Sequence, residues 1–273
     1  MRIHILLILA VALILTSCGD GRKASALLKQ AEDAYSLADY NTAKQLIDSI
    51  RTTYPKAFDV RKKGVKLMQH VELDEQKATV IYLDSLMAVR QASLDSIVGN
   101  FVLEKDTAYQ EIGNYFWPTQ TVEKNIGRSF LRAHVNELGE MSLTSIYCGS
   151  GNIHHTSVKV TVDGETYADT PASTDSYETT DLGQAIEKAD YKLSEAEDVV
   201  AFIIANRDAK SIRLEFKGDK SYKTVMQPND VKAICGIYTL TQILSSMEQI
   251  RNDKKEAQLK IQFVTRKMQE GEE

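Results

Sequence analysis

The sequence predicts an α+β protein in which helical segments flank a central antiparallel β-rich domain. Two long segments, one on each side of the middle of the chain, carry apolar residues at helical spacing. Between them, residues 107–227 hold most of the Gly, Thr and Tyr, and short alternating runs there are separated by turn residues. With 273 residues, 43% of them hydrophobic, the chain is long enough to bury a sizeable core.

Residues 24–57 are predicted to form a helical hairpin, with a turn at 39–41 and an end at Pro55, because proline cannot continue a helix. The twelve-residue interval from Ala43 to Pro55 resembles that of a tetratricopeptide repeat, and this resemblance implies a peptide-binding groove. However, Ala38 replaces the usual central glycine, and a single repeat cannot bury its own face. An ordinary hairpin packed on its neighbours is therefore the alternative.

The chain from residue 60 to about 106 is predicted to be mostly helical, with a narrow apolar stripe close to a coiled-coil pattern. This stripe contains Val80, Leu83, Met87, Leu94 and Ile97. A second long helix is predicted after Pro228, with Asp230 as its N-cap. Its stripe contains Ile234, Ile237, Leu240, Leu244, Met247 and Ile250, and resumes at Ala257, Ile261, Val264 and Met268. We expect the helices to pack antiparallel as a stalk; the alternative is that the stripes mediate homodimerisation.

Six strands are predicted in the middle of the chain, forming three hairpins of a small sandwich or barrel. The strand pairs are 129–134 with 141–147, 158–162 with 165–167, and 212–216 with 222–226. Residues 194–206 fit a buried strand or a helix. The capping-box spacing of Ser194 and Glu197 favours the helix.

The start of the chain has the order of a secretory signal peptide. Arg2 precedes an apolar run at residues 5–15, which is too short to span a membrane. Leu15-Thr16-Ser17-Cys18 then resembles the lipobox of bacterial lipoproteins, which implies cleavage before Cys18 and lipidation of that residue. An ordinary signal peptide with a chance cysteine is the alternative.

The chain as a whole resembles Gram-negative lipoproteins in which a helical hairpin precedes a β-rich domain and a terminal helix. The predicted parts are a signal peptide at 1–17, a lipidated tether at 18–23, the hairpin with the long helix at 24–106, the β-rich domain at 107–227 and the C-terminal helix at 228–273. Only Asp20 is acidic directly after the cysteine, whereas some surface-exposed lipoproteins carry an acidic cluster there. This favours an outer-membrane anchor that faces the periplasm.

The charge balance and the motifs exclude several function classes. The net charge of −5 becomes −6 when Arg2 is removed, which argues against nucleic acid as a partner. Cys148, His154 and His155 lie within eight residues, but a fourth ligand is missing, so no metal site is predicted. Neither a G-x-S-x-G elbow nor a phosphate-binding glycine loop occurs, so no catalytic residue and no cofactor are predicted.

Two features leave alternatives open. Tyr115, Phe116 and Trp117 could form a stacking platform for a glycan or a partner, or part of the core, which the sequence favours. An exported compartment permits a Cys148–Cys235 disulfide. However, Cys235 lies in a predicted buried helix segment, which favours a free thiol.

Four tripeptides resemble the Asp-Ser/Thr-apolar sequon for O-glycosylation in some Gram-negative anaerobes. Their acceptor residues are Ser49, Ser85, Ser96 and Thr107. Together these features predict a membrane-anchored, non-catalytic scaffold or adaptor with a protein partner. The alternatives are a glycan- or ligand-binding lipoprotein and, less favoured, an envelope hydrolase with paired carboxylates or a Cys–His pair.

Overall fold

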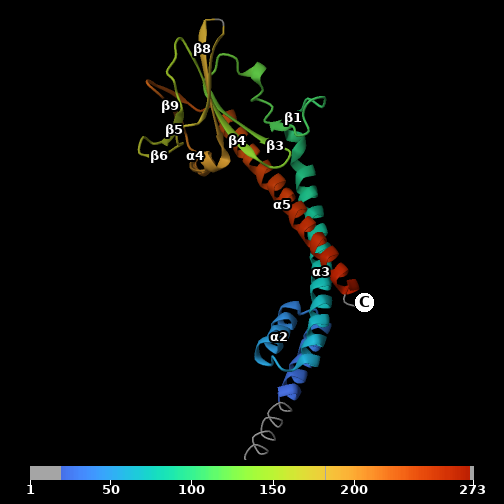
Figure 1. The fold of residues 1–273 in the computed structure, drawn as a ribbon. Coiled ribbons are helices and arrows are strands. Elements are labelled where there is room, and N and C mark those ends of the chain that lie inside the picture. The colour runs from blue at the N-terminus through green and yellow to red at the C-terminus, as the bar shows by residue number, and fades with distance from the viewer. Residues whose placement is uncertain (1–19, 182, 271–273) are drawn as a thin grey trace, which may run out of the picture. The chain divides into compact units, whose positions relative to one another are not determined.

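The structure is a computed structural model that describes residues 20–181 and 183–270, and it divides into two compact units (Figure 1). The first, called the helical unit here, comprises the described residues of Met1–Leu86 and Ile250–Glu273. The second, the sheet unit, comprises Met87–Gln249. The α+β class predicted from the sequence is confirmed, with helices at the N-terminal end and a long C-terminal helix.

The predicted helical hairpin is present. Residues 20–36 are helical, and α2 (Tyr40–Thr53) follows a short turn. The turn lies at 37–39, two residues before its predicted place, because the Asp39 carboxylate accepts a hydrogen bond from the Thr42 N–H (3.1 Å) and so caps α2. The buried small side chains Ala31 and Ala43 let the two helices approach each other closely.

The long helix α3 (Phe58–Ile97) ends in a short 3-10 turn, η1 (Val98–Asn100). The prediction of helix up to residue 106 is wrong, because β1 (Val102–Glu104) follows this turn and pairs with β2. Gly99 and Asn100 favour helix poorly, which accounts for the end of the helix there.

The last helix is α5 (Pro228–Glu270). Within the helical unit it runs antiparallel to α3, as predicted: Lys254 pairs with Asp84, and further along α5 Val264 lines a groove together with Met68 of α3. Val264 is buried, so this end of the apolar stripe is covered within the chain. The stripe from Ile234 to Leu244 is buried in the core of the sheet unit.

In the described residues of the sheet unit, ten strands form two antiparallel sheets. Sheet A has the order β1-β2-β3-β4-β8-β7, and sheet B has the order β10-β9-β5-β6. Sheet A contains β1 with β2 (Asn114–Phe116), β3 (Phe130–Asn136), β4 (Met141–Gly149), β7 (Asp175–Asp181) and β8 (Gln184–Lys192). Sheet B contains β5 (Ser157–Val162), β6 (Thr166–Asp169), β9 (Arg213–Lys217) and β10 (Ser221–Val225). One apolar core joins both sheets, α4 (Leu193–Ala205) and the first part of α5.

The three predicted hairpins are correct. The β5–β6 turn places Asp163 and Gly164 at φ +55° and +81°, the conformation that favours an Asp-Gly pair. Four strands were not predicted, among them β8, in which Glu187 occupies a buried position where an apolar residue is expected. The polar segment 170–177 contains the start of the edge strand β7.

Two predicted helix caps are wrong, although both helices are present. At the start of α4, the Glu195 carboxylate accepts from the Lys192 N–H (2.8 Å), so the capping pair begins two residues before Ser194. Asp230 lies in the first turn of α5, where its buried carboxylate pairs with Arg128 (2.7 Å) instead of capping the helix.

Candidate functional site

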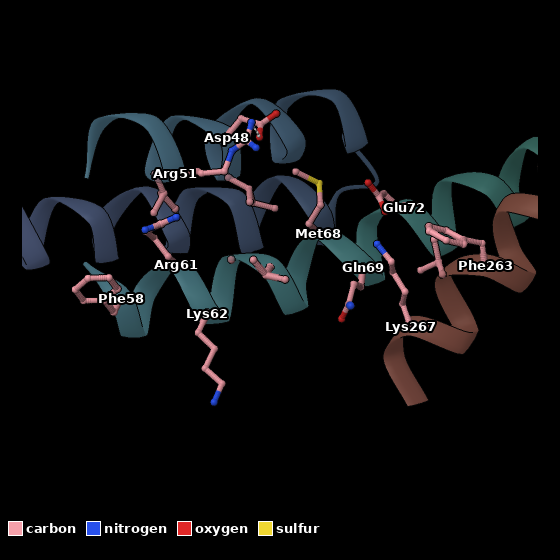
Figure 2. A pocket seen from close by; sticks show the side chains of 15 residues that line it. Asp48, Arg51, Phe58, Arg61, Lys62, Met68, Gln69, Glu72, Phe263 and Lys267 are labelled. Atoms are coloured by element: carbon pink, nitrogen blue, oxygen red, sulfur yellow. Dashed lines mark ion pairs between the residues drawn. The ribbon is translucent and has the colours of Figure 1, made fainter. Parts of the chain in front are cut away.

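The helical unit contains a groove of about 620 Å³ between α2, α3 and the end of α5, which we call the α2–α3 groove (Figure 2). Its apolar part includes Phe58, Val65 and Phe263, which are 72%, 58% and 48% exposed. Gly64 lies beneath it, where a Cβ atom would lie 3.5 Å from the Ile47 side chain. The groove therefore combines a floor formed by packed helices with large exposed apolar side chains.

The rim of the α2–α3 groove is mainly basic. Its charged residues are Arg51, Arg61, Lys62 and Lys267 against Asp48 and Glu72. Arg51 pairs with Asp48 (3.1 Å), whereas Arg61 donates from Nη1 to the Pro55 carbonyl (2.8 Å). The buried Nε atom of Arg61 has no hydrogen-bond partner among the described residues. This excess of positive charge is notable because the whole chain is net negative.

The aromatic cluster lies mostly within the packed interior of the sheet unit. Phe116 is buried under the guanidinium of Arg132 (Cζ to ring centroid 4.1 Å). Half-buried Trp117 meets Phe101 edge to face at 5.5 Å. Burial and the nearby carboxylate of Glu137 raise the pKa of half-buried Tyr115. Phe116 is therefore part of the packed interior, whereas Tyr115 and Trp117 stay half-buried.

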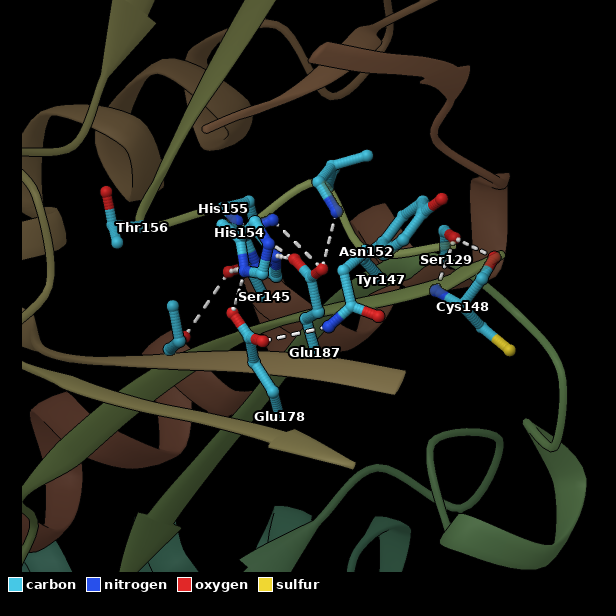
Figure 3. Close-up of polar contacts among 12 residues, drawn as sticks. Ser129, Ser145, Tyr147, Cys148, Asn152, His154, His155, Thr156, Glu178 and Glu187 are labelled. Carbon is cyan, nitrogen blue, oxygen red and sulfur yellow. Dashed lines mark hydrogen bonds and ion pairs between the residues drawn. The ribbon is translucent and has the colours of Figure 1, made fainter. Parts of the chain in front are cut away.

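Cys148 and Cys235 do not form the disulfide that the sequence permitted. Both are free thiols. Cys148 Sγ donates to Gln184 Oε1 (3.2 Å), and burial raises the pKa of this thiol. Figure 3 shows its sulfur pointing away from His154 and His155. A Cys–His catalytic pair is therefore not formed, because β4 directs Cys148 to the face of sheet A opposite that of Ser145.

A buried polar network that the sequence did not predict joins Ser145, His155 and Glu187 (Figure 3). Ser145 Oγ lies 2.8 Å from His155 Nε2, and His155 Nδ1 lies 2.9 Å from Glu187 Oε2. The Glu187 carboxylate also accepts from the backbone N–H groups of Ile153, His154 and His155, at 2.7, 3.0 and 2.9 Å. Burial alone raises the pKa of Glu187, but these four donors outweigh burial and hold that pKa below its ordinary value.

This order of hydroxyl, imidazole and carboxylate matches that of a nucleophilic triad, but its surroundings differ. All three side chains are fully or almost fully buried, so a substrate cannot reach Ser145 Oγ. The contacts instead fix the segment that enters β5. The pairing of β4 with β8 brings Glu187 to this segment, and no local sequence pattern predicts that contact.

One group of side chains has ligand atoms close enough for a cation. His154, Glu178 and Glu187 each place one such atom within 4.8 Å of the others. However, Glu187 already accepts four hydrogen bonds, and Glu178 accepts from Asn152 and contacts His154 Nδ1 (2.8 and 2.9 Å). The hydrogen bond to Glu178 raises the pKa of His154, which disfavours the neutral ring that metals require. These residues are a poor fit to a metal ion.

The four predicted O-glycosylation acceptors differ in their surroundings. Ser49, Ser85 and Ser96 lie on α2 and α3 and donate to carbonyls of the preceding turn. Thr107 is exposed in an irregular segment between β1 and β2; Ser85 and Ser96 are also exposed, whereas Ser49 is half-buried. The proposed lipidation residue Cys18 and the signal peptide lie outside the described residues. Within 20–181 and 183–270, no helix is both long and apolar enough to cross a membrane.

Comparisons of the chain with models of protein families, with curated proteins and with solved structures find no match.

Proposed function

We propose that this chain is a non-catalytic adaptor of the cell envelope, anchored to the outer membrane through lipid on Cys18. In this proposal the α2–α3 groove binds a segment of a partner protein that carries apolar side chains flanked by Asp or Glu. The observation that carries it is the combination of an exposed apolar floor with a basic rim. Helix-lined grooves of this type bind amphipathic peptides through a few apolar anchors.

Charge complementarity selects the kind of partner. Lys62 is exposed, and Lys267 lies over the Phe263 ring (4.6 Å). Neither lysine forms an ion pair among the described residues, so both can pair with an incoming carboxylate. Opposite charges around an apolar contact increase the association rate and fix orientation more than they increase affinity. We therefore expect association that weakens with added salt.

The test is photo-crosslinking in native cells, followed by affinity purification of the full chain in mild detergent. A crosslinking amino acid at Val65 lies in the groove, and the same probe at Leu37 is more exposed (81% against 58%) but lies outside it. The expected result is a near-stoichiometric partner captured from Val65 and absent from Leu37, crosslinked through an acidic, apolar segment. Equal capture from both positions, or capture at neither, would overturn the proposal.

A charge reversal provides the second arm of this test. Lys62→Glu with Lys267→Glu should reduce capture of that partner at least tenfold. The matched control, Lys63→Glu with Lys66→Glu, changes exposed lysines of α3 that do not line the groove and should leave capture unchanged. If both double variants behave alike, the basic rim does not recognise the partner.

A further inference from the structure

A second cavity, of about 310 Å³, lies on the face of sheet A that points away from the common core. We call it the outer-face cleft; its floor comes from β3, β4 and β8, and residues 120–128 form its wall. The strand register places Phe130, Ile146 and Lys188 in one row across these strands, with Cys148 and Ile186 in the next. Since alternate residues share a face, this arrangement follows from the register alone.

The wall of the cleft is fixed by buried hydrogen bonds. Gln120, which is fully buried, donates to the Leu131 carbonyl (2.9 Å) and accepts from the Ala133 N–H (3.1 Å). Asn125 donates to the Thr119 and Thr121 carbonyls, both at 2.8 Å. Satisfied polar contacts of this kind make a segment rigid, so the cleft is formed before any ligand arrives.

The cleft contains more positive charge than its own residues neutralise. Arg128 is paired with Asp230, but the Arg132 side chain is only 15% exposed and its nearest carboxylate, Glu104, is 3.9 Å away. Its buried Nε atom has no hydrogen-bond partner in the part of the chain described. Burial lowers the pKa of Arg132 despite the nearby acidic groups of Glu104, Glu123 and Asp190. A mostly buried guanidinium that has a buried Nε without a hydrogen-bond partner and no carboxylate closer than 3.9 Å among the described residues is stabilised by an added anion.

Lys188 supplies the second cation. Its row neighbours Phe130 and Ile146 are apolar, and within the described residues it forms no ion pair. Asp181 is the one acidic residue that lines the cleft. An apolar floor next to two cations matches a ligand that has a flat or chain-like apolar body and one negative end.

We propose that the outer-face cleft binds a small organic carboxylate with an apolar body, with Arg132 and Lys188 binding the carboxylate and Phe130, Ile146 and Ile186 contacting the body. A volume of about 310 Å³ is at the lower end for small-molecule sites, so the ligand is small. This site lies entirely in the sheet unit and is independent of the α2–α3 groove.

The test uses the full chain in lipid nanodiscs, with 2-naphthoate and octanoate as probes and 2-naphthylmethanol as an uncharged analogue. Cys148 lines the cleft, whereas Cys235 lies outside it, so the two thiols give a site readout and an internal control in one molecule. Alkylation rates by iodoacetamide are measured for each cysteine by peptide mass spectrometry. We expect saturating 2-naphthoate to slow alkylation of Cys148 at least fivefold and leave Cys235 unchanged.

Variants separate charge recognition from apolar binding. Lys188→Met and Arg132→Gln should each raise the concentration of 2-naphthoate that half-protects Cys148 about tenfold. The control Lys192→Met removes an exposed lysine of β8 that does not line the cleft and should have no effect. Because Lys188 is at the surface of the sheet, its variant keeps the test valid even if Arg132→Gln fails to fold.

Three results would overturn the inference. One is the absence of Cys148 protection by both carboxylates at millimolar concentration. Another is equal protection by 2-naphthylmethanol, which would mean that the cations do not recognise the ligand. The last is unchanged affinity in Lys188→Met.

Discussion

Replacing Glu187 by glutamine tests the buried network that joins β8 to the segment before β5. Glutamine has nearly the same shape, but one carboxylate oxygen becomes an NH₂ group. Oε1 accepts from the N–H groups of Ile153 and His154, and Oε2 accepts from two N–H groups of His155. Whichever oxygen is replaced, two buried donors lose their acceptor and face another donor.

The expected loss of folding stability follows from these contacts. A hydrogen bond to a charged group contributes about 1.5–3 kcal/mol, and local relaxation recovers part of this, so we expect Glu187→Gln to lower the free energy of unfolding by about 3 kcal/mol. With an m-value of about 2 kcal/mol/M in urea, the midpoint should fall by about 1.5 M. Trp117, the only tryptophan, lies in the sheet unit, so its fluorescence reports the unfolding of that unit.

The pH dependence of this effect has a definite sign. The pKa of Glu187 is lower in the folded state than its ordinary value of 4.5, so its stabilisation is present above that value and is lost as pH falls through the folded pKa. The difference between wild type and Glu187→Gln should therefore be complete at pH 7 and should narrow below about pH 4.5. The control is Glu178→Gln. The Glu178 carboxylate is partly exposed, so its replacement should lower the free energy of unfolding by less than about 0.5 kcal/mol. A midpoint shift below about 0.3 M, or the same shift in both variants, would refute the reasoning.

Three further predictions concern other parts of the chain. Gly139→Ala should lower the thermal midpoint of the sheet unit far more than Gly164→Ala. Both glycines have φ above +80°, but a Cβ at Gly139 would lie 2.1 Å from the backbone of α5, whereas the space at Gly164 is open. Equal shifts of the two midpoints in calorimetry would contradict this. The hydrogen bond to Asp74 (2.6 Å), and to a lesser extent burial, raises the pKa of Tyr35 to about 12. The contribution of this contact to folding stability is therefore complete below about pH 10 and is lost as pH rises through 12. A tyrosinate absorbance titration should show one tyrosine ionising near pH 12 that moves downward in Asp74→Asn, and an unchanged curve would count against the contact. Cys18→Ser should release the protein from the membrane fraction, and retention at wild-type levels would reject the anchor.

The helices and three hairpins could be predicted because each depends on local patterns. The stripe of α5 repeats at helical spacing, and Asp163-Gly164 favours the tight turn that joins β5 and β6. β8 could not be predicted in the same way, since Glu187 breaks its apolar alternation and only its tertiary partners compensate for the buried charge. The predicted caps at Ser194 and Asp230 were wrong for two reasons. The Glu195 carboxylate accepts from the Lys192 N–H, so the capping pair lies earlier in the chain, and the Asp230 carboxylate pairs with Arg128, which lies far away along the chain.

The sequence by itself determined the class of fold, the signals at the N-terminus that predict export and lipidation, and the stretches that become helices and hairpins. These features depend on residues near one another in the chain. Only the tertiary structure decided which side chains meet: His155 reaches Glu187 across 32 positions, and Lys188 joins Phe130 and Ile146 through strand pairing. The physical reason is that strand register and helix packing are set by burial summed over the whole core, and no short segment carries that information.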